Sequence, residues 1–205
     1  MQLKKYGAVC IFLLSLTFLI GCVKNESHYY ADNDHPGTAI FSNTGNNVFS
    51  CYINGQAWRT IDRKIGGFGS STYEVGITKQ NFDSLTDHLS INWFGYYLNN
   101  QYDYGTISLV LSVPKNFTMA DFSALQGKRL IIDGVNSNFS AQVDNTINGA
   151  GSGSIYFNTA LLYSNGVNRV ITGRMSGLLE ADFGSVLLTS GKFDHNLDGI
   201  PLFFQ

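Results

Sequence analysis

Charged residues are scarce in this chain of 205 residues: 13 Lys and Arg and 15 Asp and Glu make up 14% of it, with a formal net charge of −2. No cluster of basic residues is present to neutralise phosphate groups, which argues against nucleic acid as a partner. Proline is also rare, at three residues, whereas glycine (22 residues) and aromatic residues (14%) are frequent. This composition is typical of a protein built from strands and glycine-containing turns.

The sequence also lacks the motifs of metal and nucleophilic catalysis. None of the four histidines, His28, His35, His88 and His195, has a histidine or cysteine two or four residues away, as a zinc site uses. No serine stands in the G-x-S-x-G turn between a strand and a helix that exposes a nucleophile. The sequence therefore predicts no metal ligands and no cofactor.

The N-terminal segment predicts export and lipid attachment. Lys4 and Lys5 precede an uncharged apolar run (residues 9–20) that suits a signal peptide and is too short to span a bilayer. Gly21 and Cys22 at its end resemble the bacterial lipobox, whose cysteine is diacylated and becomes the first residue of the mature chain. We therefore expect residues 1–21 to be a lipoprotein signal peptide. Acylated Cys22 would anchor the protein in a membrane of the cell envelope, expected to be the outer membrane, on its periplasmic or its surface face.

Beyond Cys22 the pattern predicts a tether and one domain. Residues 22–45 are polar and rich in turn formers, which indicates a flexible tether. Residues 46–205 are enough for one β domain with a sizeable core. Cys10 leaves with the signal peptide and Cys22 would be acylated, so no disulfide partner remains for Cys51. Its alternation with Phe49 predicts that Cys51 lies on the buried face of a strand.

The pattern within the domain predicts an all-β fold. Asn54-Gly55 supply the positive φ angles of a two-residue hairpin between residues 49–53 and 57–61. Thr118, Asp121 and Gly127 have the spacing of a capping box and a stop for one short helix, residues 118–126. Further strands are expected at residues 73–77, 89–93, 107–113, 129–133, 139–143, 155–162, 167–175, 178–183 and 186–193. About ten strands without alternating helices predict an antiparallel β-sandwich or barrel.

Two segments carry a family resemblance. Residues 49–58 (FSCYINGQAW) and 188–194 (LTSGKFD) resemble the first and last strands of uncharacterised lipoproteins common in Bacteroidota. Those chains open with a strand, an N-G or D-G turn and a Trp, and they finish with a G-[RK]-F-D strand. The resemblance covers the two ends of the domain, and it implies a lipoprotein of β architecture without assigning catalytic residues.

The densest group of aromatic residues follows Trp93. Tyr96, Tyr97, Tyr102 and Tyr104 are interleaved with Asn, Gln and Asp. Rings beside amide and carboxylate groups suit the stacking of sugar rings or an interface with another protein. We therefore take these four tyrosines as the candidate ligand-binding residues, with packing in the sheet as the alternative use of the same rings.

Two acidic motifs suggest further sites. Glu180 and Asp182 share one face of a strand, with carboxyl groups roughly 6–7 Å apart, near the lower end of the range for inverting glycosidases. Apolar residues on the opposite face indicate that this pair faces solvent. Residues 194–199 match the first half of a calcium loop, but the twelfth position is Gln205, so the bidentate carboxylate is missing and a polar turn is the expectation.

These patterns predict a non-enzymatic, lipid-anchored envelope protein that binds a glycan, a peptide or a partner protein. Two alternatives remain: an envelope hydrolase that uses Glu180 and Asp182, and a purely structural component of the envelope.

Overall fold

The strand periodicity is realised as one continuous, strongly curved sheet. The computed structural model describes residues 26–64, 71–143, 146–164, 171–200 and 202–204. The strands are β1 (Val48–Ile53), β2 (Gln56–Thr60), β3 (Val75–Asn81), β4 (Thr86–Tyr97), β5 (Asn100–Pro114), β6 (Arg129–Ile132), β7 (Asn138–Val143), β8 (Thr146–Ser164), β9 (Ile171–Asp182), β10 (Leu187–Asn196) and β11 (Leu202–Phe204). A short helix, α2 (Met119–Ser123), follows β5.

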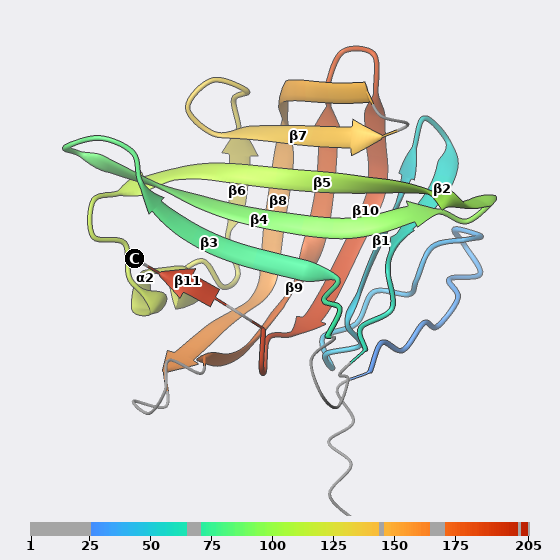
Figure 1. The fold of residues 1–205 in the computed structure, drawn as a ribbon, viewed down its shortest axis with the longest axis horizontal. Helices are drawn as coiled ribbons and strands as arrows, with labels where there is room; N and C mark the ends of the chain where they lie inside the picture. Colours follow the sequence, from blue (N-terminus) through green and yellow to red (C-terminus); the bar gives the residue numbers. More distant parts are fainter. Residues whose placement is uncertain (1–25, 65–70, 144–145, 165–170, 201, 205) are drawn as a thin grey trace, which may run out of the picture.

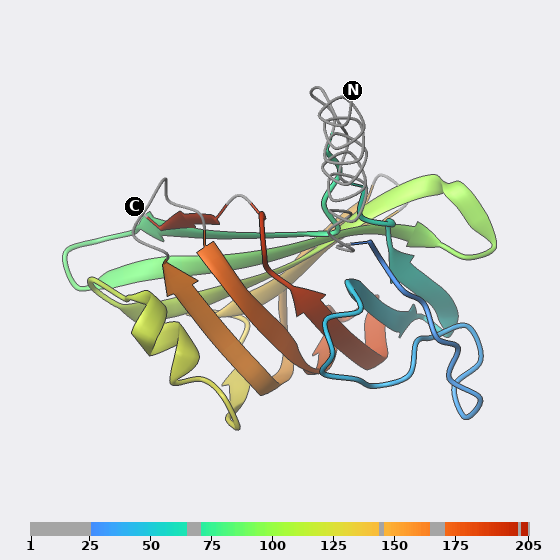
Figure 2. The ribbon, with the colours of Figure 1, turned by 90° about the horizontal axis from the view of Figure 1, so that it is seen from below.

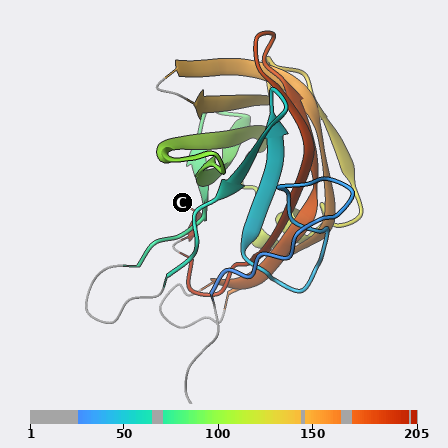
Figure 3. The same cartoon turned by 90° about the vertical axis from the view of Figure 1, so that its right-hand side faces the viewer.

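Eight of these strands close into an antiparallel barrel. The ring runs from β4 through β2, β1, β10, β9, β8 and β7 to β5, which pairs with β4 again. Figure 3 shows the wall from one side, with β1 and β10 next to each other. The expected all-β antiparallel class is confirmed, and the closed ring identifies the fold as a barrel rather than a sandwich.

The remaining strands, β3, β6 and β11, extend the wall. On one edge of β4, β2 pairs with residues 95–97 and β3 with residues 87–93, so β2 and β3 follow each other along a single edge. β11 lies parallel to β3, and β6 pairs with β8. In Figure 1, β3, β4, β5 and β7 cross in front of β8, β9 and β10.

The two local predictions are confirmed. Ile53 pairs with Gln56 across a two-residue turn in which Asn54 and Gly55 have φ angles of 49° and 79°. At α2 the Thr118 hydroxyl accepts from the Asp121 amide at 3.2 Å, and the Asp121 carboxylate accepts from the Thr118 amide at 2.8 Å. The helix is shorter than expected, and Figure 2 shows it against one end of the wall, beside β8.

Large side chains fill the barrel. Phe49, Trp58, Trp93, Phe157 and Phe193 are almost completely buried. Their rings are in contact, with centroids 5.0 Å apart for Phe49 and Trp93 and 5.8 Å apart for Trp93 and Phe193. Such aromatic pairs add about 0.5–1.5 kcal/mol each beyond the burial of their area.

Cys51 lies in this interior with no exposed surface, as its alternation with Phe49 predicts. Its burial raises the pKa of the thiol well above the ordinary value.

One expected break in the sheet is absent. Residues 167–175 and 178–183 were expected to be separate strands, but within the described residues β9 runs unbroken over Ile171–Asp182. Gly177 is needed for close packing rather than for a turn, because a Cβ atom there would lie 1.9 Å from the Tyr156 carbonyl oxygen and 2.6 Å from the Phe193 ring.

The segment before β1 lies along the barrel wall. The sequence predicts a flexible tether over residues 22–45, whereas residues 31 and 39 form a β-bridge. Thr38 and Ala39 are buried, and the Ala39 amide donates to Ser50 Oγ at 2.7 Å. Asp32 forms an ion pair with Lys192 of β10. These contacts hold residues 31–39 against β1 and β10, while the bounds of the signal peptide and of the domain stay predictions.

Candidate functional site

Among the side chains that the structure describes, none on the outside of β3, β4, β5 and β7 carries a formal charge. We call sixteen of the outward positions of these strands the uncharged face. They are Gly76, Thr78, Gln80, His88, Ser90, Asn92, Phe94, Tyr96, Tyr104, Thr106, Ser108, Val110, Ser112, Asn138, Ser140 and Gln142. Each is exposed or half-buried and alternates with inward residues, most of them buried and apolar. The uncharged face looks toward the viewer in Figure 1.

The uncharged face is a grid of hydroxyl and amide groups set by the strand register. Asn92 lies opposite Ser108, and Ser108 lies opposite Ser140 on β7. Ser108 Oγ donates to Asn92 Oδ1 at 2.7 Å. From His88 to Tyr96 along β4 the face is roughly 26 Å long, at about 3.3 Å per residue. Most of these side chains are short, so the surface has few protruding groups and an extended ligand could lie across several strands.

Aromatic rings border the grid at one end. Tyr104 is 69% exposed and packs edge-on against Tyr96 on the neighbouring strand, with ring centroids 6.3 Å apart. Arg59 holds Tyr96 in place because its Nη2 donates to the Tyr96 hydroxyl at 3.0 Å. The Arg59 guanidinium also lies 4.9 Å from the Tyr29 ring. Phe94, which is 39% exposed, lies between these rings and the hydroxyl rows.

The other end carries a second pair of rings. Phe82 stacks on His88, with ring centroids 3.9 Å apart and planes 14° from parallel. Phe82 is 63% exposed. The uncharged face thus has flat apolar rings at both ends. Between these rings it consists mainly of groups that both donate and accept hydrogen bonds.

The four tyrosines predicted from the sequence do not form one shelf. Tyr96 and Tyr104 face outward and pair across β4 and β5. Tyr97 points into the barrel and is only 7% exposed, because strand alternation turns it away from Tyr96. Tyr102 lies in β5, and its side chain is outside the described set. The structure adds Phe94, which lies in the same aromatic segment but was not among the four candidates, and the Phe82–His88 pair, which lies outside that segment.

Glu180 and Asp182 lie as the sequence predicts, on the outside of β9. Both side chains are exposed. Glu180 lines a pocket of about 180 Å³, and Asp182 is not among the residues that line it. The pair therefore does not bracket a common pocket in the way that two carboxylates flank a glycosidic bond.

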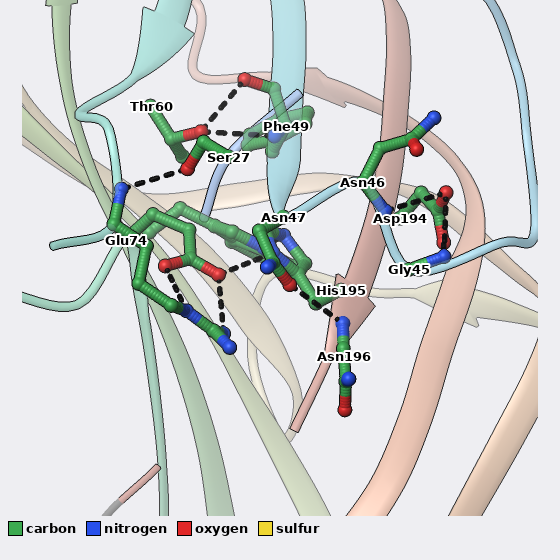
Figure 4. A network of polar contacts seen from close by, with 12 residues as sticks. Ser27, Gly45, Asn46, Asn47, Phe49, Thr60, Glu74, Asp194, His195 and Asn196 are labelled. Carbon is green, nitrogen blue, oxygen red and sulfur yellow. Dashed lines mark hydrogen bonds and ion pairs between the residues drawn. The ribbon is translucent and has the colours of Figure 1, made fainter. Parts of the chain in front are cut away.

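The polar turn at residues 194–199 has a structural role. The Asp194 carboxylate accepts from the amides of Thr44 (3.2 Å), Gly45 (2.9 Å) and Asn46 (3.1 Å). The Ser42 hydroxyl donates to it as well. Asp194 therefore fixes the loop before β1, and Figure 4 shows it facing that loop. Within the described residues no group of three or more His, Cys, Asp or Glu side chains could hold a metal ion.

A buried chain of polar groups, which was not predicted from the sequence, lies at the junction of β2, β3 and β10 (Figure 4). The Arg63 guanidinium binds both oxygens of Glu74, at 2.9 and 2.6 Å. His195 Nδ1 lies 3.0 Å from Glu74 Oε1, and the Trp93 indole donates to His195 Nε2 at 3.1 Å. Because an indole only donates, Nε2 is the acceptor and the ring proton is on Nδ1.

This chain of groups is suited to holding strands together rather than to catalysis. The side chains of Arg63, Glu74 and His195 have no exposed surface, and both nitrogens of the imidazole already have partners. Burial alone would raise the pKa of Glu74, but the hydrogen bonds from His195 and Arg63, together with the charge of Arg63, outweigh it and lower the pKa below its ordinary value.

Comparison of the chain with protein-family models, with curated proteins and with solved structures found no match. No helix in the described part of the chain is long and apolar enough to cross a membrane.

Proposed function

We propose that this protein is a lipid-anchored binding module of the bacterial cell envelope whose uncharged face holds a neutral glycan chain. The observation that carries this proposal is the absence of charge from sixteen outward positions on four neighbouring strands. The other wall of the barrel, by contrast, carries Arg129, Arg174, Glu180, Asp182 and Lys192 on its outside.

The chemistry of the uncharged face suits sugars better than a protein surface. Covering a charged side chain with a neutral ligand costs desolvation energy, and this face has none to cover. Ser, Thr, Asn and Gln both donate and accept hydrogen bonds, as sugar hydroxyls do. A protein interface is about half apolar in area, whereas Val110 and Phe94 are the only apolar members here besides glycine and the tyrosines. Tyr104 and Phe94 supply rings on which sugars could stack.

Affinity electrophoresis tests this proposal. We expect migration of the folded protein to be retarded in gels that contain a neutral polysaccharide, such as glucomannan or xyloglucan, and not in gels that contain anionic polygalacturonate. Tyr104→Ala and Asn92→Ala should each abolish the retardation while leaving the melting temperature nearly unchanged. Tyr163→Ala is the matched control, because Tyr163 is 55% exposed on β8, away from the uncharged face.

Binding of a neutral chain should also be insensitive to salt, since no ion pair is formed that salt could screen. If no neutral polysaccharide retards the protein, or if the control variant loses binding as fully as Tyr104→Ala does, the proposal is wrong. The hypothesis that the protein is a purely structural component of the envelope is then favoured.

The lipid anchor needs a separate test. Cys22→Ala should abolish incorporation of labelled fatty acid and block removal of residues 1–21, because thioether formation at this cysteine precedes cleavage in lipoproteins. A Cys22→Ala protein that is still labelled and cleaved would exclude the anchor.

A further inference from the structure

A pocket of about 180 Å³ opens on the charged wall of the barrel, which lies behind the uncharged face in Figure 1. Its floor is the outside of β8, β9 and β10, and one side is formed by the segment before β1. We call it the bulge pocket. Its polar lining residues are His35, Arg129, Ser154, Glu180, Ser190 and Lys192.

An irregularity in β10 shapes this pocket. Leu188 pairs with Ala181 and Gly191 with Leu179, so two residues of β10 lie opposite Glu180 alone. Ser190, one of these two, has a φ of 52°, a left-handed conformation that is rare for a residue with a side chain. Gly191 is required because a Cβ atom there would lie 2.4 Å from the Leu179 carbonyl oxygen. Such bulges redirect side chains and are frequent beside binding sites.

The charged groups around the bulge pocket form two sets of opposite charge. Lys192 is ion-paired with Asp32, and its Nζ lies 3.3 Å from His35 Nδ1. This leaves Arg129 and Glu180 as the two groups of opposite charge in the lining. Arg129 is oriented by a hydrogen bond from its Nη1 to Ser154 Oγ at 2.9 Å, which uses one of its five N–H donors. Its guanidinium also lies 5.9 Å from the Tyr156 ring.

We propose that the bulge pocket binds a free α-amino acid. The ligand's carboxylate would pair with the Arg129 guanidinium, which matches a carboxylate in shape and charge. Its ammonium group would pair with Glu180, and its side chain would lie on Leu178, which is 37% exposed. A cavity of about 180 Å³ is smaller than a drug-sized site and fits a ligand with few heavy atoms. This site lies apart from the uncharged face and does not depend on the function proposed for it.

Isothermal titration of the full chain in detergent with each of the twenty amino acids tests this site. We expect at least one to bind, and its N-acetyl and its carboxamide derivative to bind at least tenfold more weakly, because each lacks one charge. Arg129→Gln and Glu180→Gln should each weaken binding at least tenfold without changing the melting temperature.

Asp182→Asn is the matched control, since this carboxylate lies on the same strand and face but does not line the pocket; it should leave the affinity unchanged. Tyr104→Ala should leave it unchanged as well, which separates this site from the glycan proposal. The assignment is overturned if no amino acid binds the folded protein, if the neutralised derivatives bind equally well, or if Glu180→Gln retains full affinity.

Discussion

A few buried side chains neutralise one another's charge inside this barrel. Glu74 directly precedes β3 and is buried between Arg63 and His195, two groups that are 11 and 121 residues away from it in sequence. A buried charge that loses its partner destabilises a protein by about 3–5 kcal/mol. Removing the charge of Glu74 is therefore expected to have a large effect on stability.

Glu74→Gln should lower the free energy of unfolding by about 3–5 kcal/mol, because Arg63 keeps its buried charge without a counter-charge. The pH dependence has a definite sign. Since the folded pKa of Glu74 is lowered from 4.5, its contribution to stability is complete above pH 4.5 and is lost as the pH falls through the folded pKa. Urea unfolding measured from pH 7 to pH 3 should show a shallower acid loss in the variant. Glu180→Gln, at an exposed site, is the control, and an equal effect there would contradict this role.

The tyrosines of β4 and β5 give a second prediction for single residues. Tyr97→Ala should destabilise the fold by about 3–5 kcal/mol, because it removes a buried ring from the core. Tyr104→Ala should change stability by less than about 0.5 kcal/mol, because its ring is exposed at the surface. Thermal melts of the two variants distinguish these positions, and equal melting temperatures would show that the alternation of β4 is assigned incorrectly.

Neighbouring strands approach each other closely where β2 pairs with the end of β4. A Cβ atom on Gly95 would lie 2.2 Å from the Arg59 carbonyl oxygen and 2.5 Å from the Trp58 ring. Gly105, which pairs with Gly95 on β5, faces the same indole, with its Cβ position 3.6 Å from Trp58 Nε1. These two glycines make the space in which Trp58 lies inside the wall.

Gly95→Ala should therefore destabilise the barrel by about 1–3 kcal/mol or more, since backbone and indole must both move. Gly76→Ala on β3 is the control, because its Cβ would make one ordinary contact, 3.8 Å from the Phe94 ring, and should be tolerated. Chemical denaturation of both variants checks this difference, and similar losses in the two would argue against the close approach.

Features encoded by adjacent residues could be predicted from the sequence. The Asn54-Gly55 hairpin and the capping box of Thr118 and Asp121 depend on contacts within a few residues, and both form as expected. Features that depend on distant partners could not be predicted. Arg63 lies three residues after β2, and Glu74 directly precedes β3. The alternation of the predicted strand over residues 73–77 does not indicate that Glu74 has a buried partner, and the use of His195 as a neighbour requires β10 to close the ring. The uncharged face was missed for a related reason: it becomes visible only when the register of four strands places their polar residues side by side.

The molecule as a whole has two unlike sides, one without charge and one with charged residues, and neither presents a metal site among the described residues. Addition of EDTA should accordingly leave the melting temperature within about 1 °C of its starting value, because a ligand that is not bound cannot stabilise the native state. Asp194, the first residue of the partial calcium-loop match, already accepts from the amides of Thr44, Gly45 and Asn46. A fall of several degrees that calcium restores would contradict this prediction.

The pairing of β1 with β10 also constrains how the chain reaches its folded state. Val48 pairs with Asp194, so the seam of the ring joins the first strand made to the last strand of the ring. During synthesis from the N-terminus, the β1–β2 hairpin is complete long before its outer edge has a partner, and Phe49 and Ile53 stay exposed to water for that time. Contacts of such wide sequence separation slow folding, and an unpaired apolar edge invites association with other chains. We therefore expect refolding yields to fall with protein concentration and the seam to be the last part of the barrel to gain protection from hydrogen exchange.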